Sequence, residues 1–169
     1  MNRLVVLGLM LAGCDQVFGL DGRRPPGEEP TGLCGDKFGD ERYVVQPTPA
    51  RWLTAETECE KLDDPDDDWF SHLAVLTDRF EIAAFELPVG TDAWTGLVSP
   101  DRAEFLWVTS EVTGPFPFAP GKPNSTSTDR CGAARESELA LDDTGCGTPR
   151  PYVCECDQFP ALPTRYVGI

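Results

Sequence analysis

The sequence has one histidine, His72, and only 14 Lys and Arg residues against 29 Asp and Glu residues. A single histidine excludes a metal centre or a catalytic pair built from several histidines. The formal net charge of −15 argues against nucleic acid as a partner, because neutralising phosphates requires clustered Lys and Arg. No Ser lies in a Gly-x-Ser-x-Gly nucleophile motif. Without a catalytic constellation, we expect a protein that is not an enzyme.

Long apolar runs are also missing, since a bilayer-spanning helix needs about 20 apolar residues. The longest run, Leu4 to Ala12, follows Arg3 and ends in Leu11-Ala12-Gly13-Cys14. A short apolar run behind a basic residue is typical of a signal peptide, and the last four residues resemble the lipobox of bacterial lipoproteins. That resemblance implies cleavage before Cys14 and acyl chains on its thiol and amine, which anchor a protein stably in a membrane. The alternative is an ordinary secretory signal with an incidental Cys.

The lipobox resemblance predicts an exported protein of the bacterial cell envelope, anchored by lipid on the periplasmic face or the cell surface. We expect a signal peptide over 1–13, then the lipidated Cys14 and a flexible tether over 14–33 that is rich in Pro and Gly. A single domain over 34–157 and a C-terminal tail over 158–169 complete the chain. The 16 Gly and 16 Pro residues favour long turns and loops within that domain.

Periodicity predicts two helices followed by short strands. A first strand is expected over 37–45, and Thr48 and Pro49 are typical of an N-cap and a first helical position. The buried face of this helix is predicted to carry Trp52, Ala55, Cys59 and Leu62. After a strand-like apolar run over 73–76, Asp78 and Glu81 resemble a capping pair. That pair would begin a second helix, with Phe80, Ala84 and Leu87 on its apolar face. Strands over 93–98, 104–109, 131–134, 139–141 and 151–156 complete an α+β pattern.

A series of short motifs identifies the family that this domain resembles. The motifs are Trp94-Thr95-Gly96-Leu97, Phe105-Leu106-Trp107-Val108-Thr109, Gly121-Lys122-Pro123-Asn124, Cys131-Gly132-Ala133, Leu141-Asp142-Asp143-Thr144-Gly145-Cys146 and Pro151-Tyr152-Val153-Cys154-Glu155. In this order and at these spacings they resemble the C-type lectin-like domain. The resemblance implies two helices, two small antiparallel sheets, a long loop region and stabilising disulfides. It also implies structural roles for His72, Trp94, Phe105 and Trp107.

Seven cysteines are an odd number for an exported protein, and assigning Cys14 to lipid leaves six. The resemblance implies that the first helix is bonded to the last strand through Cys59–Cys154, and that Cys131–Cys146 closes the long-loop strands. The remaining Cys34 and Cys156 are expected to pair, because the first and last strands of the family lie side by side. Such a bond contributes about 4–5 kcal/mol in the chain-entropy model. A zinc site at Cys154-Glu155-Cys156 is the competing interpretation, but its spacing is too short.

The long loop carries the candidate ligand site. Calcium-binding lectins of the family hold the ion with a Glu-Pro-Asn or Gln-Pro-Asp triplet, an acidic residue before the next Cys and an Asn-Asp pair. A cis Pro in the triplet directs the flanking side chains at the ion. The resemblance therefore implies that Ca²⁺, which prefers oxygen ligands, is bound here by the side chains of Asn124, Asp129, Asp142 and Asp143.

Lys122 departs from that pattern, because it places an ammonium where the family has a carboxylate or amide. A cation about 4 Å from Ca²⁺ is strongly repelled. Two outcomes are open. Lys122 turns into solvent and leaves a weakened calcium site, or its charge replaces the ion among Asp129, Asp142 and Asp143. We expect carbohydrate binding through the weakened calcium site of the first outcome. The alternative, which the second outcome predicts, is a calcium-independent protein-interaction or structural module.

A second acidic segment lies between Leu62 and His72, with Asp at positions 63, 64, 66, 67 and 68. Closely spaced Asp residues in a loop suit Ca²⁺, but EF-hand spacing and its turn glycine are missing. A solvated acidic loop is therefore the favoured interpretation.

Overall fold

The computed structural model describes residues 34, 42–63, 69–87, 90–111, 116–124 and 129–169. Its elements are β1 (Tyr43–Ala50), α2 (Trp52–Glu60), β2 (Phe70–Leu73), α3 (Arg79–Ala83), β3 (Asp92–Val98), β4 (Leu106–Trp107), β5 (Asp129–Arg135), β6 (Ala140–Gly145) and β7 (Arg150–Asp157). Two 3₁₀ turns cover Glu136–Glu138 and Pro163–Arg165. Two helices and several short strands confirm the expected α+β class. Within these ranges no helix is long and apolar enough to cross a membrane.

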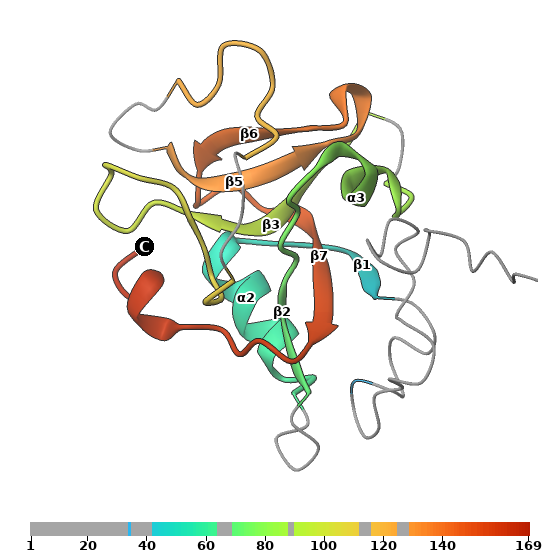
Figure 1. The fold of residues 1–169 in the computed structure, drawn as a ribbon, viewed down its shortest axis with the longest axis vertical. Coiled ribbons are helices and arrows are strands. Elements are labelled where there is room, and N and C mark those ends of the chain that lie inside the picture. The colour runs from blue at the N-terminus through green and yellow to red at the C-terminus, as the bar shows by residue number, and fades with distance from the viewer. Residues whose placement is uncertain (1–33, 35–41, 64–68, 88–89, 112–115, 125–128) are drawn as a thin grey trace, which may run out of the picture.

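The described strands form one mixed sheet instead of the two small antiparallel sheets expected from the sequence. Its order is β1-β7-β3-β5-β6, with β2 also paired to β7 and β4 to β3 (Figure 1). One edge of β7 pairs with β1, while the other edge pairs with β2 near Cys154 and with β3 at Tyr152. The contact of Trp94 with Tyr152 is parallel. This single pairing connects the two groups of strands.

The first helix begins later than predicted. β1 continues through Thr48 and Pro49, and α2 starts at Trp52 with Arg51 as an N-cap that makes no side-chain hydrogen bond. Pairing of Ala50 with Arg150 keeps this stretch extended. β1 is an edge strand, where a proline removes no necessary ladder hydrogen bond. Tertiary pairing therefore overrides the local helix-start signal.

The apolar face of α2 is confirmed. Trp52, Ala55 and Cys59 are fully buried, and they recur at the three- and four-residue spacing that places side chains on one helical face. The indole Nε1 of Trp52 donates to the carbonyl of Thr95 at 2.8 Å. The helix is thus attached to β3 by a hydrogen bond as well as by packing.

The second helix, α3, is shorter than predicted, and only part of its predicted apolar face is buried. Asp78 is its N-cap as expected and accepts hydrogen bonds from the backbone N–H groups of Phe80 and Glu81. Phe80 was expected on the apolar face, but its side chain is 67% exposed. Leu87, also expected there, is buried, and so are Ile82 and Phe85. A helix of five residues has little more than one turn, so helical spacing cannot fix its buried face.

Three disulfides confirm the expected pairings, Cys34–Cys156, Cys59–Cys154 and Cys131–Cys146. Cys154 and Cys156 lie two residues apart on β7, so their side chains share one face of the strand. Both belong to the same apolar cluster as Trp52 and Trp94. The two bonds therefore fasten the start of the domain and α2 to the same face of the last strand.

The apolar run over 73–76 is buried but leaves the sheet after Leu73. Its backbone N–H groups are bonded by two buried carboxylates. Glu56 of α2 accepts from Leu73 N at 2.9 Å, and Glu155 of β7 accepts from Val75 N at 2.7 Å. The N–H group between them, that of Ala74, donates to the carbonyl of Val153 on β7 at 2.9 Å, so the buried N–H groups of Leu73, Ala74 and Val75 are all bonded.

His72 lies beside these carboxylates and is fully buried. Its Nδ1 is 3.0 Å from the carbonyl of Leu73, and its Nε2 is 3.2 Å from Asp157 Oδ1. Burial opposes a charge on the ring, but the hydrogen bond to Asp157 and the neighbouring carboxylates outweigh it and raise the pKa of His72 to about 10. A charged imidazolium donating from both nitrogens is consistent with the structural role expected for it.

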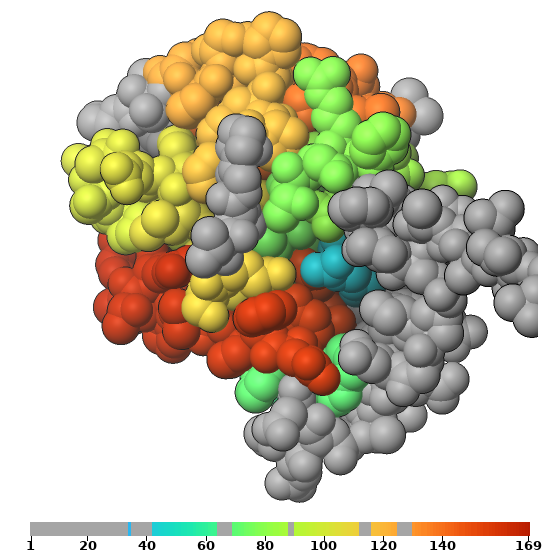
Figure 2. Space-filling model, in the orientation of Figure 1, coloured from blue at the N-terminus to red at the C-terminus, as the bar shows by residue number. Residues whose placement is uncertain are grey.

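Trp94 and Trp107 are core residues as predicted, and Phe105 is partly buried against the same core. The segment 158–169, expected as a tail, lies against the domain. Leu162 N donates to the carbonyl of Val108 at 2.7 Å, and the ring of Tyr166 packs edge-on against Trp52. In Figure 2 this red segment forms one surface with the yellow-green residues that precede β4 and follow β3.

Candidate functional site

The expected ligand residues come from two parts of the long-loop region. Lys122 and Asn124 follow the turn at Gly121, and the Lys122–Pro123 peptide is cis, as in the triplet of the family. Asp142 and Asp143 are adjacent on β6. Asp129 begins β5, where its backbone pairs with Gly145, but its side chain and residues 125–128 lie outside the described part of the chain. The structure therefore brings four of the five predicted site residues together.

The ammonium of Lys122 occupies the centre of this group. Its Nζ is 2.6 Å from Asp142 Oδ1, 3.7 Å from Asp143 Oδ1 and 3.0 Å from Asn124 Oδ1. The contact with Asp142 raises the pKa of Lys122, and Asp143 adds to the effect. The lysine is thus charged at any physiological pH and contacts three of the four oxygen-bearing side chains predicted to hold a metal.

Asp143 connects the two parts of the site. Its side chain is fully buried, and its Oδ1 accepts a 2.9 Å hydrogen bond from the backbone N–H of Asn124. Its other oxygen, Oδ2, is buried and has no hydrogen-bond partner among the described residues. A buried carboxylate needs a nearby positive charge, and among the described residues Lys122 supplies it.

Asp142 lies between two cations. While Oδ1 faces Lys122, Oδ2 is 3.7 Å from Arg135 Nη1. Arg135 also pairs with Glu138 at 2.7 Å and lies 4.0 Å from Asp92 on β3. The acidic pair on β6 is therefore compensated from the loop side by Lys122 and from the β5 side by Arg135.

Arg135 is the member of this site that sequence reasoning missed. It ends β5, directly after the buried residues Ala133 and Ala134. A charged residue directly after the buried run Cys131-Gly132-Ala133-Ala134 was the available signal. The sequence gives no signal for the position of Arg135 beside Asp142, because that position depends on the pairing of β5 with β6 at Ala140.

The residues present do not fit a calcium ion in this arrangement. Ca²⁺ requires six to eight oxygen ligands at 2.3–2.6 Å, but an ammonium stands among the oxygens that would supply them. Across the described residues, no group of three or more His, Cys, Asp or Glu side chains is arranged to hold a metal. The second of the two sequence-based outcomes, replacement of the ion by Lys122, matches the geometry.

The acidic segment near Asp63 lies mostly outside the described residues, which exclude 64–68. Asp63 itself accepts a hydrogen bond from the backbone N–H of Ser71 at 2.5 Å, and burial raises its pKa. This hydrogen bond joins Asp63, before the segment, to Ser71, after it. The expectation of a solvated acidic loop stays a prediction.

Comparison with known proteins gives one family and many similar folds. The family model for the lectin C-type domain matches residues 48–156. The C-type lectin CEL-I from Cucumaria echinata is 21% identical with a TM-score of 0.62, and the match covers 68% of this chain and 89% of that one. No curated protein sequence matches the chain.

Two further solved structures show the range of this fold. The carbohydrate-recognition domain of cow CD23, solved in the presence of a GlcNAc₂Man₃ oligosaccharide, is 21% identical with a TM-score of 0.57, covering 68% of this chain and 85% of that one. A calcium-independent type II antifreeze protein is 19% identical with a TM-score of 0.57, covering 69% of this chain and 85% of that one. At these identities the likeness concerns the fold.

Proposed function

Because the chain belongs to the C-type lectin domain family, we propose that it is a recognition protein whose long-loop site works without calcium. The observation that carries this proposal is the 2.6 Å contact between Lys122 Nζ and Asp142 Oδ1. The ammonium provides the positive charge that Asp142 and Asp143 need, and it contacts the side chain of Asn124. It therefore holds the loop against β6, as a bound ion does in calcium-dependent members.

The proposed ligand is a protein surface. Calcium-dependent sugar binding uses open coordination positions on the ion for vicinal hydroxyls, and an ammonium held by carboxylates offers none. Solved structures of this fold include CD23 in the presence of an oligosaccharide and a calcium-independent antifreeze protein. Fold alone does not decide between them, so the proposal rests on the Lys122 contacts.

Restoring the family's triplet tests the proposal directly. We expect calorimetric titration of Ca²⁺ into the full chain, disulfides intact, to give no saturable heat for the native protein. Lys122→Glu should create a Glu-Pro-Asn triplet and give one-site binding, because a carboxylate then replaces the ammonium among the oxygen ligands. The double variant Lys122→Glu with Asn124→Ala should lose that heat.

Lys61→Glu is the matched control. It makes the same change of charge at an exposed lysine whose ion pair, within the described part of the chain, is with Glu58 three residues away, so it should gain no calcium site. Saturable calcium binding by the native chain that disappears in Asn124→Ala would overturn the proposal. It would instead support a calcium-dependent lectin with Lys122 displaced.

Ligand binding provides a second measurement. The full chain is screened on a glycan array and against immobilised envelope proteins, with and without a calcium chelator. We expect protein binding that the chelator leaves unchanged. Glycan binding that the chelator abolishes would contradict both the ligand and the mechanism proposed here.

We also propose that the domain is displayed from a bacterial membrane by lipid on Cys14. Support comes from the Leu11-Ala12-Gly13-Cys14 motif and from the cysteine count. All six other cysteines are paired in disulfides, so Cys14 is the one left over. The stretch from 15 to 33, rich in Pro and Gly, suits a spacer between membrane and domain.

A further inference from the structure

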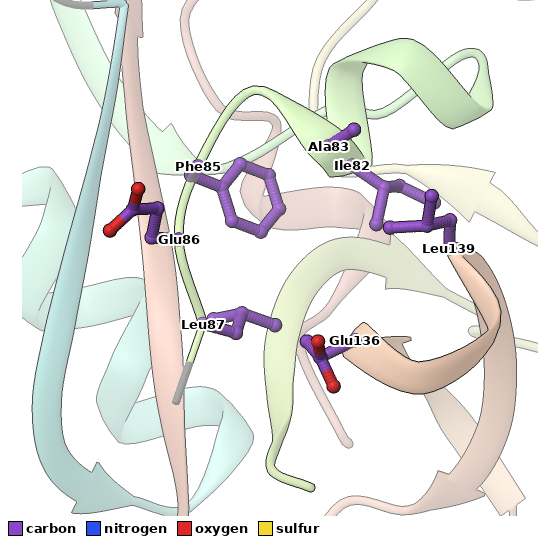
Figure 3. A pocket seen from close by; sticks show the side chains of 7 residues that line it. All are labelled: Ile82, Ala83, Phe85, Glu86, Leu87, Glu136 and Leu139. Atoms are coloured by element: carbon purple, nitrogen blue, oxygen red, sulfur yellow. The ribbon is translucent and has the colours of Figure 1, made fainter. Parts of the chain in front are cut away.

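A pocket of about 290 Å³ lies on the side of the domain that carries α3, and its lining includes no residue of the Lys122 site. Its lining comes from the end of α3, the segment after it and the turn between β5 and β6: Ile82, Ala83, Phe85, Glu86, Leu87, Glu136 and Leu139. Figure 3 shows Phe85 and Leu87 on one side and Ile82 and Leu139 on the other, facing a common space. None of these residues takes part in the long-loop site.

Leu139 is held at the edge of this pocket in an unfavourable conformation. Its φ of 46° and ψ of 51° are left-handed, a region that costs a bulky residue about 1 kcal/mol or more and that Gly or Asn adopt readily. Its side chain is nevertheless 40% exposed. Burial of Leu139 in the folded domain therefore does not explain why a leucine occupies this turn.

A second exposed apolar side chain comes from the helix that forms one wall of the pocket. Phe80 on α3 is 67% exposed, and it precedes Ile82 of the pocket wall by two residues. Together Phe80 and Leu139 are two of the five large apolar side chains exposed among the described residues. Of the two, Leu139 lines the pocket, and an exposed apolar side chain beside a hollow lined mainly by apolar residues is typical of a protein-binding surface.

The charge at the pocket is negative. Glu136 lies at its lower edge, and Glu86 lies on its outer side, directed away from Phe85 and Leu87 (Figure 3). The described lining residues include no Lys or Arg. An apolar hollow with a carboxylate at its edge suits a side chain that has an apolar stem and a cationic end, which is the form of lysine and arginine.

We propose that this pocket binds a basic, apolar segment of a partner protein, with a lysine or arginine stem between Leu87 and Leu139 and its charge at Glu136. The volume is at the lower limit of small-molecule sites, which span about 300–1,000 Å³, and is suited to one or two anchoring side chains of a larger partner. The proposal goes beyond the calcium-independent function and does not depend on it, since the two sites share no residue.

The test uses nuclear magnetic resonance titration of the isotope-labelled full chain with three six-residue peptides. One alternates leucine with lysine or arginine, one replaces its leucines with serine, and one replaces its basic residues with glutamate. Only the first should bind, shifting the amide signals of Leu87, Glu136 and Leu139. The amide signal of Lys122 should stay unchanged, which would show that the peptide binds at the pocket and not at the proposed calcium-independent site.

Two variants identify the determinants of binding. Glu136→Gln should weaken binding of the basic peptide about fivefold, the equivalent of an exposed ion pair worth about 1 kcal/mol. Leu139→Gly should weaken it at least tenfold. Because glycine adopts the left-handed conformation freely, the same variant should unfold at an equal or higher temperature. A merely structural leucine would instead lower the unfolding temperature when removed.

Leu53→Ala is the matched control, since Leu53 is 43% exposed on α2 and does not line the pocket. It should leave peptide affinity unchanged. The proposal is overturned if none of the peptides binds, if all three bind equally, or if the basic peptide binds Leu139→Gly and Glu136→Gln as tightly as the native chain.

Discussion

Lys122 shows how much of the candidate site depends on one residue. The oxygen-bearing positions Asn124, Asp142 and Asp143 were expected from their family spacings to the cysteines, and the structure places their side chains around Lys122. The sequence left open whether Lys122 turns outward or replaces the ion, because that choice depends on distances across the loop. The 2.6 Å contact with Asp142 is a tertiary fact that no local pattern contains.

Glu56 gives a pH prediction at the residue scale. It is fully buried on α2, and burial raises its pKa to about 8 despite the neighbouring His72 and the hydrogen bond from Leu73. The folded state therefore binds more protons than the unfolded state, whose Glu pKa is about 4.3. Between those values the free energy of unfolding falls as pH rises. We expect Glu56→Gln, which keeps the hydrogen-bond acceptor without the ionisation, to gain stability relative to the native chain from pH 5 to pH 8.

Urea denaturation at several pH values measures that difference. Glu58→Gln is the control, because Glu58 is exposed on the same helix and its ion pair among the described residues is with the exposed Lys61. Its stability relative to the native chain should not change over this range. A difference between Glu56→Gln and the native chain that is constant with pH would show that Glu56 does not ionise on unfolding.

At the scale of elements, the sequence predicted the buried face of a helix better than the residues at which helices and strands begin and end. Trp52, Ala55 and Cys59 identified the buried face of α2, because core packing imposes the helical period. The predicted start of that helix was wrong, because β1 extends through Pro49. That extension depends on pairing with a strand about one hundred residues later in the chain. Phe80 was misplaced for the same reason, because the single turn of α3 is positioned by neighbours rather than by its own pattern.

The packing of β3 against β5 gives a prediction for this scale. A methyl group added at Gly132 would lie 2.5 Å from Leu97 Cβ, well inside van der Waals contact. Gly132→Ala should therefore force the two strands apart and lower the free energy of unfolding by about 1–3 kcal/mol. Gly147→Ala is the control, because an added methyl there meets nothing within 4 Å. Equal stabilities of the two variants in urea denaturation would contradict this account of the β3–β5 contact.

At the scale of the whole molecule, the cysteine positions fixed more of the architecture than the strand patterns did. All three disulfides were predicted from the family resemblance, because their spacings follow the order of elements. The union of the strands into one sheet was not predicted. It depends on a single parallel pairing between Trp94 and Tyr152, which leaves no periodic signal in either segment.

The Cys34–Cys156 bond gives a prediction that follows from how the disulfides are nested. Its sequence separation of 122 corresponds to about 5 kcal/mol in the chain-entropy model. With Cys59–Cys154 intact, however, the bond closes only the 25 residues from Cys34 to Cys59 and the two from Cys154 to Cys156. We expect Cys34→Ala with Cys156→Ala to lower the free energy of unfolding by about 3.5 kcal/mol.

Urea denaturation of the double variant measures this loss. The comparison is the double alanine variant of Cys131 and Cys146, whose 15-residue separation corresponds to about 3 kcal/mol. The two losses should therefore be similar. A loss for the Cys34–Cys156 variant that exceeds the other by 2 kcal/mol or more would mean that the nested bond does not shorten the effective loop.

The position of the molecule in the cell gives the last prediction. If Cys14 carries lipid, expression in a bacterium fed an alkyne-labelled fatty acid should label the native chain and place it in the membrane fraction. Cys14→Ala should remove the label and release the protein, because two or more acyl chains supply the anchoring energy, about 0.8 kcal/mol per buried CH₂. Asp15→Ser, which changes the next residue and keeps the thiol, should still be labelled. A labelled Cys14→Ala protein, or an unlabelled native chain with a free thiol, would show that the motif belongs to an ordinary secretory signal.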